Sequence, residues 1–237
     1  MIGNKVYFGK QIMIDIHTHI LPGADDGAED AQMTAQMLKR AADMGVQTIV
    51  CTPHVYRPEH QRRIRMGWTS TEQSARQHGI RLLGGCEFNY HMLSETRPDQ
   101  LDAFCIASTP CILLELSNSH LFRGWEACIC EMVDHGYQPI IAHPERYSYI
   151  QKDIEIANAM CDFGCEMQVD AGGLLAGLFS AERRTARKLL SQGLVSYIAS
   201  DAHTPQDYET YEKAYRTFEK EWPRRNRLLK HLRRQMK

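Results

Sequence analysis

Short apolar runs alternate along the chain with longer segments in which apolar residues recur every three or four positions. The first pattern predicts buried strands and the second predicts amphipathic helices. The predicted strands are 12–16, 48–52, 80–87, 110–116, 138–142, 166–169 and 194–200. The predicted helices are 29–44, 71–77, 125–133, 154–163, 181–190 and about 208–222. The less regular, basic stretch 55–66 is expected to be a mobile loop over a site.

Strands that alternate with helices through short connections are typical of a parallel α/β barrel or a wound sheet. Glycines such as Gly45 and Gly164 follow the helical segments directly, where they favour helix ends. We therefore expect one α/β domain over 12–222. It is flanked by an N-terminal extension, 1–11, and by a basic C-terminal tail, 223–237.

Composition narrows the function classes. With 237 residues, 43% of them hydrophobic, the chain can bury a full core, and its formal net charge of −1 disfavours wholesale nucleic-acid binding. No apolar stretch has the length of a signal peptide core or a membrane span, so a cytoplasmic protein is expected. The eight cysteines form no paired C-x-x-C knuckles and are predicted to be reduced core thiols.

Potential metal ligands lie at the ends of six of the seven predicted strands, and only the sixth strand lacks one. In parallel α/β barrels these carboxyl ends carry the chemistry. Five histidines and four carboxylates without clustered cysteines suit Mn²⁺, Fe or Zn²⁺, and nine ligands imply two or three ions. Such a centre favours hydrolysis of a phosphate ester. The candidate ligands, with Glu87 as the expected bridge, are His17, His19, Asp26, His54, Glu87, Glu115, His143, Asp201 and His203.

Two arginines are candidates for binding the substrate. Arg146 follows His143 by three residues, so its guanidinium either contacts phosphate oxygens or forms a surface ion pair with Glu145. Arg57 opens the basic stretch 55–66, which either receives an acidic substrate or is a solvated loop.

These motifs resemble the polymerase-and-histidinol-phosphatase (PHP) superfamily. The pattern is closest to its bacterial tyrosine-protein phosphatases, which regulate capsule and exopolysaccharide synthesis. The resemblance runs from about residue 13 to 215. It is carried by Asp15-Ile16-His17-Thr18-His19, Asp25-Asp26-Gly27, Thr52-Pro53-His54, Cys86-Glu87, Leu114-Glu115, Ala142-His143-Pro144-Glu145-Arg146-Tyr147 and Ser200-Asp201-Ala202-His203.

The resemblance implies a single-domain, distorted (β/α)7 barrel with three metal ions, usually Mn or Fe. It places His17, His19, Glu87 and Asp201 on one ion, Glu87, Glu115 and His143 on the second, and Asp26, His54 and His203 on the third. By the same resemblance, a metal-bridging hydroxide would attack phosphorus in line, Arg146 would steady the phosphoryl oxygens, and Asp201 and His203 would belong to the catalytic set. The implied partner is a phosphotyrosine protein, typically the tail of a bacterial tyrosine kinase, and homo-oligomers are also implied.

Three alternatives stay open at this point. The run Cys51 to Arg57 has the C-x5-R spacing of cysteine-dependent tyrosine phosphatases, but Pro53 and Val55 fit poorly in a phosphate-binding loop. A PHP-type phosphatase acting on a small metabolite, such as histidinol phosphate, would use the same metals. A non-catalytic metal-binding protein is the third alternative, and the intact set of nine ligand positions disfavours it.

Overall fold

Parallel strands form the centre of the molecule in the computed structural model, which describes residues 13–57, 60–221 and 227–235. One sheet has the order β1 (Met13–Asp15), β2 (Val46–Cys51) and β4 (Arg81–Gly84). The other has the order β3 (His54–Val55), β5 (Glu87–Asn89), β6 (Cys111–Glu115), β7 (Gln138–Ala142), β8 (Glu166–Asp170) and β9 (Val195–Ala199). Every pairing between these strands is parallel, which confirms the predicted α/β class.

The predicted strand 80–87 is divided in two, and so is the strand that precedes it. β2 pairs with β4, and their continuations β3 and β5 pair with each other in the second sheet. The break in the later strand lies at Gly85 and Cys86. A Cβ atom on Gly85 would lie 3.1 Å from Val50 and 3.2 Å from Ile106, so the chain can bend this close to its neighbours because a glycine is there.

Backbone contacts just beyond β1 and β9 bring the edges of the two sheets together. Thr18 and Ala202 form an isolated parallel bridge, and the Asp201 N–H donates to the His17 carbonyl over 3.0 Å. The Ser200 hydroxyl donates to the buried Asp15 carboxylate over 2.6 Å. Pairing among the described residues therefore gives two sheets joined by a bridge, where the sequence led us to expect one distorted barrel.

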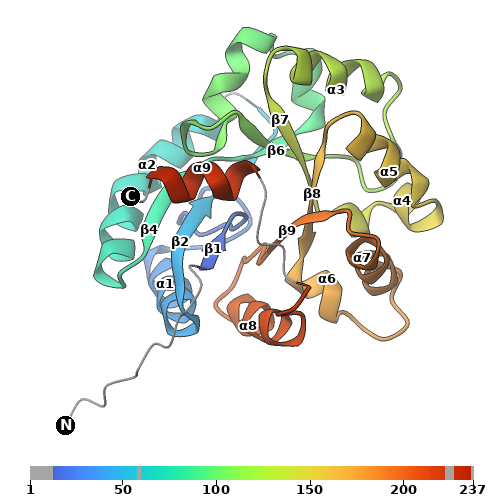
Figure 1. Cartoon of the computed structure of the whole chain (residues 1–237). Helices are drawn as coiled ribbons and strands as arrows, with labels where there is room; N and C mark the ends of the chain where they lie inside the picture. Colours follow the sequence, from blue (N-terminus) through green and yellow to red (C-terminus); the bar gives the residue numbers. More distant parts are fainter. Residues whose placement is uncertain (1–12, 58–59, 222–226, 236–237) are drawn as a thin grey trace.

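Helices surround the strands (Figure 1). The first helix ends where the sequence indicates, because Gly45 adopts the left-handed conformation there. At its start the Asp30 carboxylate accepts the Met33 N–H. The described α-helices are α1 (Ala31–Met44), α2 (His60–Gln77), α3 (Trp125–Asp134), α4 (Ser148–Lys152), α5 (Glu155–Asp162), α6 (Ala171–Leu175), α7 (Ala181–Ser191), α8 (Asp207–Thr217) and α9 (Arg227–Gln235).

The expectation of a mobile loop over 55–66 is wrong beyond residue 59, because α2 begins at His60 and continues to Gln77. Thr71 and Ala75 on this helix are buried, and Ile64 and Trp68 pack against the core. These four positions share one helical face, a period that the arginines around them obscured in the sequence. Among the residues that the structure describes, four short 3₁₀ segments also occur: η1 (Tyr90–Ser94), η2 (Pro98–Phe104), η3 (Ile106–Ser108) and η4 (Pro144–Arg146).

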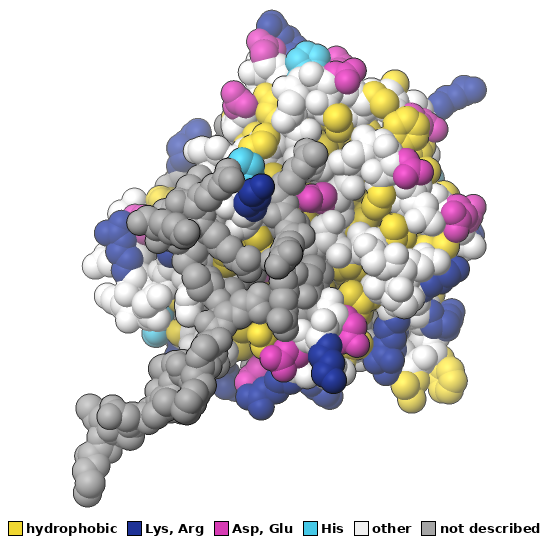
Figure 2. All heavy atoms as spheres, in the orientation of Figure 1, with side chains coloured by type: hydrophobic (Ala, Val, Ile, Leu, Met, Phe, Trp, Pro, Cys, Tyr) yellow, Lys and Arg dark blue, Asp and Glu magenta, His cyan; other side chains and the backbone are white. Residues whose placement is uncertain are grey.

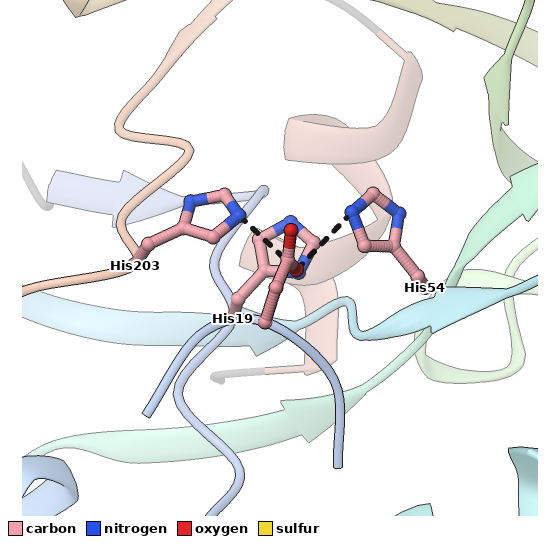
Figure 3. Close-up of side chains that lie close together, drawn as sticks. His19, His54 and His203 are labelled. Carbon is pink, nitrogen blue, oxygen red and sulfur yellow. Dashed lines mark ion pairs between the residues drawn. The ribbon is translucent and has the colours of Figure 1, made fainter. Parts of the chain in front are cut away.

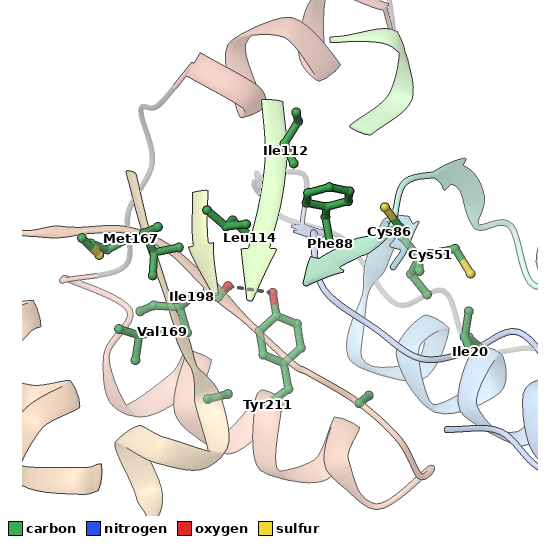
Figure 4. Packing of buried hydrophobic residues seen from close by; sticks show 14 of the residues in the cluster. Ile20, Cys51, Cys86, Phe88, Ile112, Leu114, Met167, Val169, Ile198 and Tyr211 are labelled. Atoms are coloured by element: carbon green, nitrogen blue, oxygen red, sulfur yellow. Dashed lines mark hydrogen bonds between the residues drawn. The ribbon is translucent and has the colours of Figure 1, made fainter. Parts of the chain in front are cut away.

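Strand side chains alternate between two apolar layers. Those pointing outward meet the helices; Ile112, Leu114, Met167, Val169 and Ile198 belong to this layer (Figure 4). Those pointing inward form a separate cluster that includes Leu113 on β6, Ile140 on β7 and Tyr197 on β9. The inner layer supports the strand ends that carry the candidate metal ligands.

α9 completes the inner layer. Its Leu228, Leu229 and Leu232 side chains are buried in the inner cluster, while Lys230 is exposed. Figure 1 shows this helix lying across the strands. Part of the predicted basic tail, 223–237, thus packs as an amphipathic helix. The predicted N-terminal extension, 1–11, lies outside the described residues.

The face shown in Figure 2 carries Lys and Arg side chains interspersed with Asp and Glu, with hydrophobic groups scattered among them. Within 13–57, 60–221 and 227–235, we find no helix with the length and apolar character needed to cross a membrane.

The packing of α9 predicts a stability effect. Leu232→Ala should lower the free energy of unfolding by about 2–5 kcal/mol, because it opens a cavity at a fully buried position. The exposed Lys230→Ala on the same helix should change it by less than about 0.5 kcal/mol. Urea denaturation measures both. Equal stability of the two variants would show that α9 does not pack as described.

Candidate metal centre

The fold brings all nine predicted metal ligands to one region. His17 and His19 follow β1, Asp201 and His203 follow β9, and Glu87 begins β5. The same region receives the side chains of Asp26, His54, Glu115 and His143. Their nitrogen and oxygen atoms form four overlapping groups, and within each group these atoms lie within 4.8 Å of one another.

One group lies at the more open edge of the centre. His19, His54 and His203 come from three separate segments and converge (Figure 3). An Asp26 carboxylate oxygen lies 3.4 Å from His54 Nε2 and 3.5 Å from His203 Nε2. The Asp26 side chain is 68% exposed and that of His203 is 29% exposed, so solvent or a ligand can reach this group directly.

A second group is fully enclosed. His17 Nε2 lies 3.2 Å from His19 Nε2, with Glu87 Oε2 at 3.2 Å and Asp201 Oδ1 at 3.2 Å from the same nitrogen. His19 Nε2 is 3.4 Å from the Glu87 oxygen and 3.1 Å from the Asp201 oxygen. The His17 and His19 nitrogens and a Glu87 oxygen form one ligand group, and an Asp201 oxygen lies close to both nitrogens. Imidazole nitrogens together with carboxylate oxygens suit a borderline divalent ion.

Glu87 connects the groups. One of its oxygens lies 2.7 Å from His143 Nε2, and the other lies 2.9 Å from His54 Nδ1. His54 Nδ1 is also 3.8 Å from Glu115. This central position suits the bridging role expected for Glu87. The groups overlap differently from the predicted three sets, since His143 also groups with His17 and Asp201, and Glu115 with His54.

These side chains fit metal ions. Two donor atoms inside the groups, His54 Nδ1 and Asp201 Oδ1, are buried and make no well-directed hydrogen bond, although oppositely charged groups lie 2.9 Å and 3.2 Å away. Leaving a buried polar atom without a partner is costly, and coordination to a cation removes that cost. All four groups combine histidine with at least one carboxylate, as divalent transition-metal sites do.

The charges of the centre also favour bound metal ions. Burial alone would lower the pKa of His17, but the nearby Asp201 and Glu87 carboxylates outweigh it and raise the pKa to about 9. Burial alone would raise the pKa of Glu87, but His17 and His143 hold it well below its usual value. The buried carboxylates therefore require positive charge beside them, either as protons on imidazoles or as bound cations.

Two of the ligands have unusual backbone conformations. His143 has φ 31° and Asp201 has φ 49°, in the left-handed region that non-glycine residues seldom adopt. Each comes immediately after a strand end or one residue beyond it. Such conformations cost about 1–3 kcal/mol each and cluster at functional sites. The backbone also passes unusually close to the ligand His19 at Gly27, where a Cβ atom would lie 2.0 Å from the His19 carbonyl oxygen.

Three residues around the centre were not among the predicted site residues. Asp25 Oδ2 lies 2.7 Å from His19 Nδ1 and accepts the His54 N–H over 2.9 Å. Gln168 Oε1 lies 2.8 Å from His17 Nδ1, and Asp170 lies beside Gln168. Asp25 could have been chosen from its place beside Asp26. Gln168 and Asp170 could have been identified from the sixth predicted strand, because polar residues there alternate with Met167 and Val169 and so share one face of the strand.

Arg146 forms ion pairs with residues other than Glu145. Its Nη2 lies 2.6 Å from both Asp170 Oδ2 and Asp201 Oδ2, and its side chain is 40% exposed. Glu145 is fully buried and accepts the Asp170 N–H instead. Arg57 is exposed on the connection to α2. The substrate contacts of Arg146 and Arg57, and the catalytic roles of Arg146, Asp201 and His203, stay predictions.

The C-x5-R alternative lacks an accessible thiol. Cys51 lies on β2 with 1% of its surface exposed. Burial raises the pKa of its thiol well above its usual value, which opposes formation of the nucleophilic thiolate. We therefore base the chemistry on the metal centre.

Comparison with known proteins is consistent with this geometry. The chain is 32% identical to the tyrosine-protein phosphatase YwqE of Bacillus subtilis over 219 residues. This match covers 89% of this chain and 85% of YwqE. It is 28% identical to the tyrosine-protein phosphatase CpsB of Streptococcus agalactiae over 226 residues, covering 88% of this chain and 92% of CpsB.

Solved structures resemble the fold. A structure from work on YwqE of Bacillus subtilis and CpsB of Streptococcus pneumoniae, described as unique metal-dependent tyrosine phosphatases, matches with a TM-score of 0.75. It is 29% identical in sequence, and the match covers 87% of each chain. The phosphotriesterase homology protein of Escherichia coli is 14% identical, with a TM-score of 0.54 over 83% of this chain and 84% of that one, and so shows similarity of fold alone.

A family model described as capsular polysaccharide synthesis, CpsB/CapC, matches residues 13–225. That span contains every predicted metal ligand and agrees with the family suggested by the sequence motifs. The chain therefore belongs to the CpsB/CapC family of capsular polysaccharide synthesis proteins.

Proposed function

We propose that this chain is a metal-dependent phosphatase that removes phosphate from tyrosine side chains of a protein. The observation that carries the proposal is the convergence of five histidines and four carboxylates at the strand ends of a chain whose relatives are named tyrosine-protein phosphatases. Its proposed target is a bacterial tyrosine kinase that controls capsule or exopolysaccharide synthesis. The proposed location is the cytoplasm, with homo-oligomers as the working form.

The metal ions would be held by the nine ligands, and manganese or iron is our proposed identity. Divalent ions at such a centre activate water as a nucleophile and offset the negative charge that develops at phosphorus. Glu87, at the middle of the groups, is fully buried and is the proposed bridge. Its burial keeps it out of reach of the substrate.

Exposure indicates where the phosphate ester would bind. His17 and Glu87 are fully buried, whereas His203, Asp26 and Arg146 have exposed side-chain fractions of 29%, 68% and 40%. The substrate would therefore meet the centre at the His203 and Arg146 side. There the Arg146 guanidinium would bind non-bridging phosphoryl oxygens, for which its planar donors are suited. Asp201, which pairs with Arg146, would hold the guanidinium close to the ligands.

The proposal predicts that metal and activity are lost together. Purified protein should hold two or three divalent ions and hydrolyse a phosphotyrosine peptide, and a chelator should abolish turnover. His143→Ala should lower kcat/KM by roughly a hundredfold or more, since even residues that only orient a ligand cost 10–100-fold. The exposed His135→Ala and the buried Cys51→Ser should stay active. Full activity of metal-free protein would contradict the metal mechanism. Hydrolysis of histidinol phosphate but not of the phosphotyrosine peptide would change the proposed substrate.

Arg146 provides a second prediction. Arg146→Ala should reduce kcat/KM for the peptide by about tenfold to a hundredfold, because hydrogen bonds to charged groups contribute about 1.5–3 kcal/mol. Arg57→Ala tests the other predicted substrate contact, and the exposed Arg76→Ala on α2 is the control. Steady-state kinetics at saturating metal measure all three. Arg146→Ala with unchanged kinetics would remove Arg146 from the site.

Metal binding should depend on pH in a defined direction. His17, with its pKa raised to about 9, binds an extra proton in the metal-free protein at pH 7, and the Asp201, Asp25 and Glu87 carboxylates raise the pKa of His19 well above its usual value. A metal ion must displace the His17 proton, so affinity should rise up to about pH 9, with release of at least about one proton at pH 7. Calorimetry of Mn²⁺ binding in buffers of different ionisation enthalpy measures this release. Binding without proton release would contradict the proposed roles of His17 and His19.

A further inference from the structure

β8 has a polar inner face. Glu166, Gln168 and Asp170 alternate along it with Met167 and Val169, which pack in the outer apolar layer. Gln168 is fully buried and Asp170 is 1% exposed. Neighbouring strands β7 and β9 present Ile140, Ala142, Tyr197 and Ala199 to the inner layer instead. Burying an amide and a carboxylate on one strand is costly unless each is hydrogen-bonded, so their partners show what they do.

We propose that Gln168 and Asp170 are positioning residues for the metal centre and the phosphate site. In this assignment Gln168 fixes the ring orientation and tautomer of the metal ligand His17. Asp170 fixes the Gln168 amide with one oxygen and the Arg146 guanidinium with the other. The inference rests on the proposed function, because it assumes that His17 binds metal and that Arg146 binds phosphate.

The Gln168 amide has one arrangement that satisfies both neighbours. An ionised carboxylate only accepts hydrogen bonds, so the amide nitrogen must face Asp170 Oδ1, 2.8 Å away. The amide oxygen then faces His17 Nδ1 at 2.8 Å and can only accept. His17 Nδ1 therefore carries hydrogen, and Nε2, which faces Glu87 and Asp201, is the nitrogen that would bind a metal ion once its own proton is displaced.

The second oxygen of Asp170 serves Arg146. Arg146 Nη2 lies 2.6 Å from Asp170 Oδ2 and 2.6 Å from Asp201 Oδ2. Asp201 is itself a candidate metal ligand, so a cation bound to it would weaken its ion pair with Arg146. Asp170 has no place in the four ligand groups and so remains available to hold the guanidinium. It thereby keeps Arg146 beside the centre while leaving the rest of its donors for phosphate oxygens.

Asp170 is itself firmly placed. Its N–H donates to Glu145 Oε1 over 2.8 Å. The Glu145 side chain in turn packs so closely on Gly173 of α6 that a Cβ there would lie 2.5 Å from Oε1. The buried Asp170 carboxylate therefore contacts His17 indirectly, through Gln168, and Arg146 directly. A different substitution can remove each of these two connections.

The test uses two variants with different expected losses. Gln168→Leu removes the acceptor for His17, so the affinity of the protein for Mn²⁺ should fall about tenfold to a hundredfold, as is typical for loss of a group that orients a ligand. At saturating Mn²⁺, its KM for a phosphotyrosine peptide should stay within about twofold of wild type. Should Gln168→Leu not fold, Gln168→Asn replaces it, because its shorter side chain cannot reach both His17 and Asp170.

Asp170→Asn should weaken phosphate binding more than Mn²⁺ binding. The amide keeps an oxygen for Gln168 but turns its NH₂ group toward Arg146, so the guanidinium is released. Affinity of the Mn²⁺-loaded protein for inorganic phosphate, measured by calorimetry, should fall about tenfold, because Arg146 loses its ion pair with Asp170 and is held less firmly beside the centre. Its Mn²⁺ affinity should change less than that of Gln168→Leu. The control is Gln138→Leu on β7, a buried glutamine outside the ligand groups.

The outcomes are separable. A Gln168→Leu protein that binds Mn²⁺ as tightly as wild type overturns the positioning role of Gln168. Equal losses of Mn²⁺ and phosphate affinity in both variants, shared by Gln138→Leu, would show a general structural effect and overturn the proposal. Wild-type protein that binds no metal, or that binds it without phosphatase activity, would instead contradict the proposed function.

Discussion

Buried carboxylates at the strand ends are the constraint on which the rest of this structure depends. Glu87 is fully enclosed and Asp201 nearly so, in surroundings where an ionised group is costly unless positive charge lies beside it. Five imidazoles supply nitrogen donors around them, and a bound divalent ion is the cation that best satisfies both kinds of group. The left-handed backbone at His143 and Asp201 shows that the fold accepts local strain to aim these side chains.

Support for the ligands lies in layers beneath them. The inner apolar cluster, completed by α9, holds the strands in register, and the bridge between Thr18 and Ala202 brings the first and last strand ends together. Around the ligands, Asp25 and Gln168 contact the outer nitrogens of His19 and His17. Ligands held in this way lose little freedom when they bind metal, which is why contacts behind the ligands matter to affinity.

Much of this arrangement could be predicted from the sequence, because strand ends are marked by residue type. Apolar runs that stop at His17, Glu115 or His143 identify both a strand and its functional end, and the parallel α/β class follows from the alternation with helices. The helix from His60 was hidden because the arginines around Ile64 obscured the helical spacing of its apolar positions. Nothing in the local pattern showed that Gln168 would meet His17, since that contact joins positions 151 residues apart. The grouping of ligands likewise depends on how distant strand ends meet.

The most direct test of the account is a crystal structure of Mn²⁺-loaded protein with anomalous diffraction recorded at the manganese absorption edge. The account predicts two or three anomalous peaks among the nine side chains, with Glu87 contacting more than one of them. Peaks located elsewhere on the molecule, or none among these residues in protein that is enzymatically active, would contradict the claim that this cluster is the metal centre.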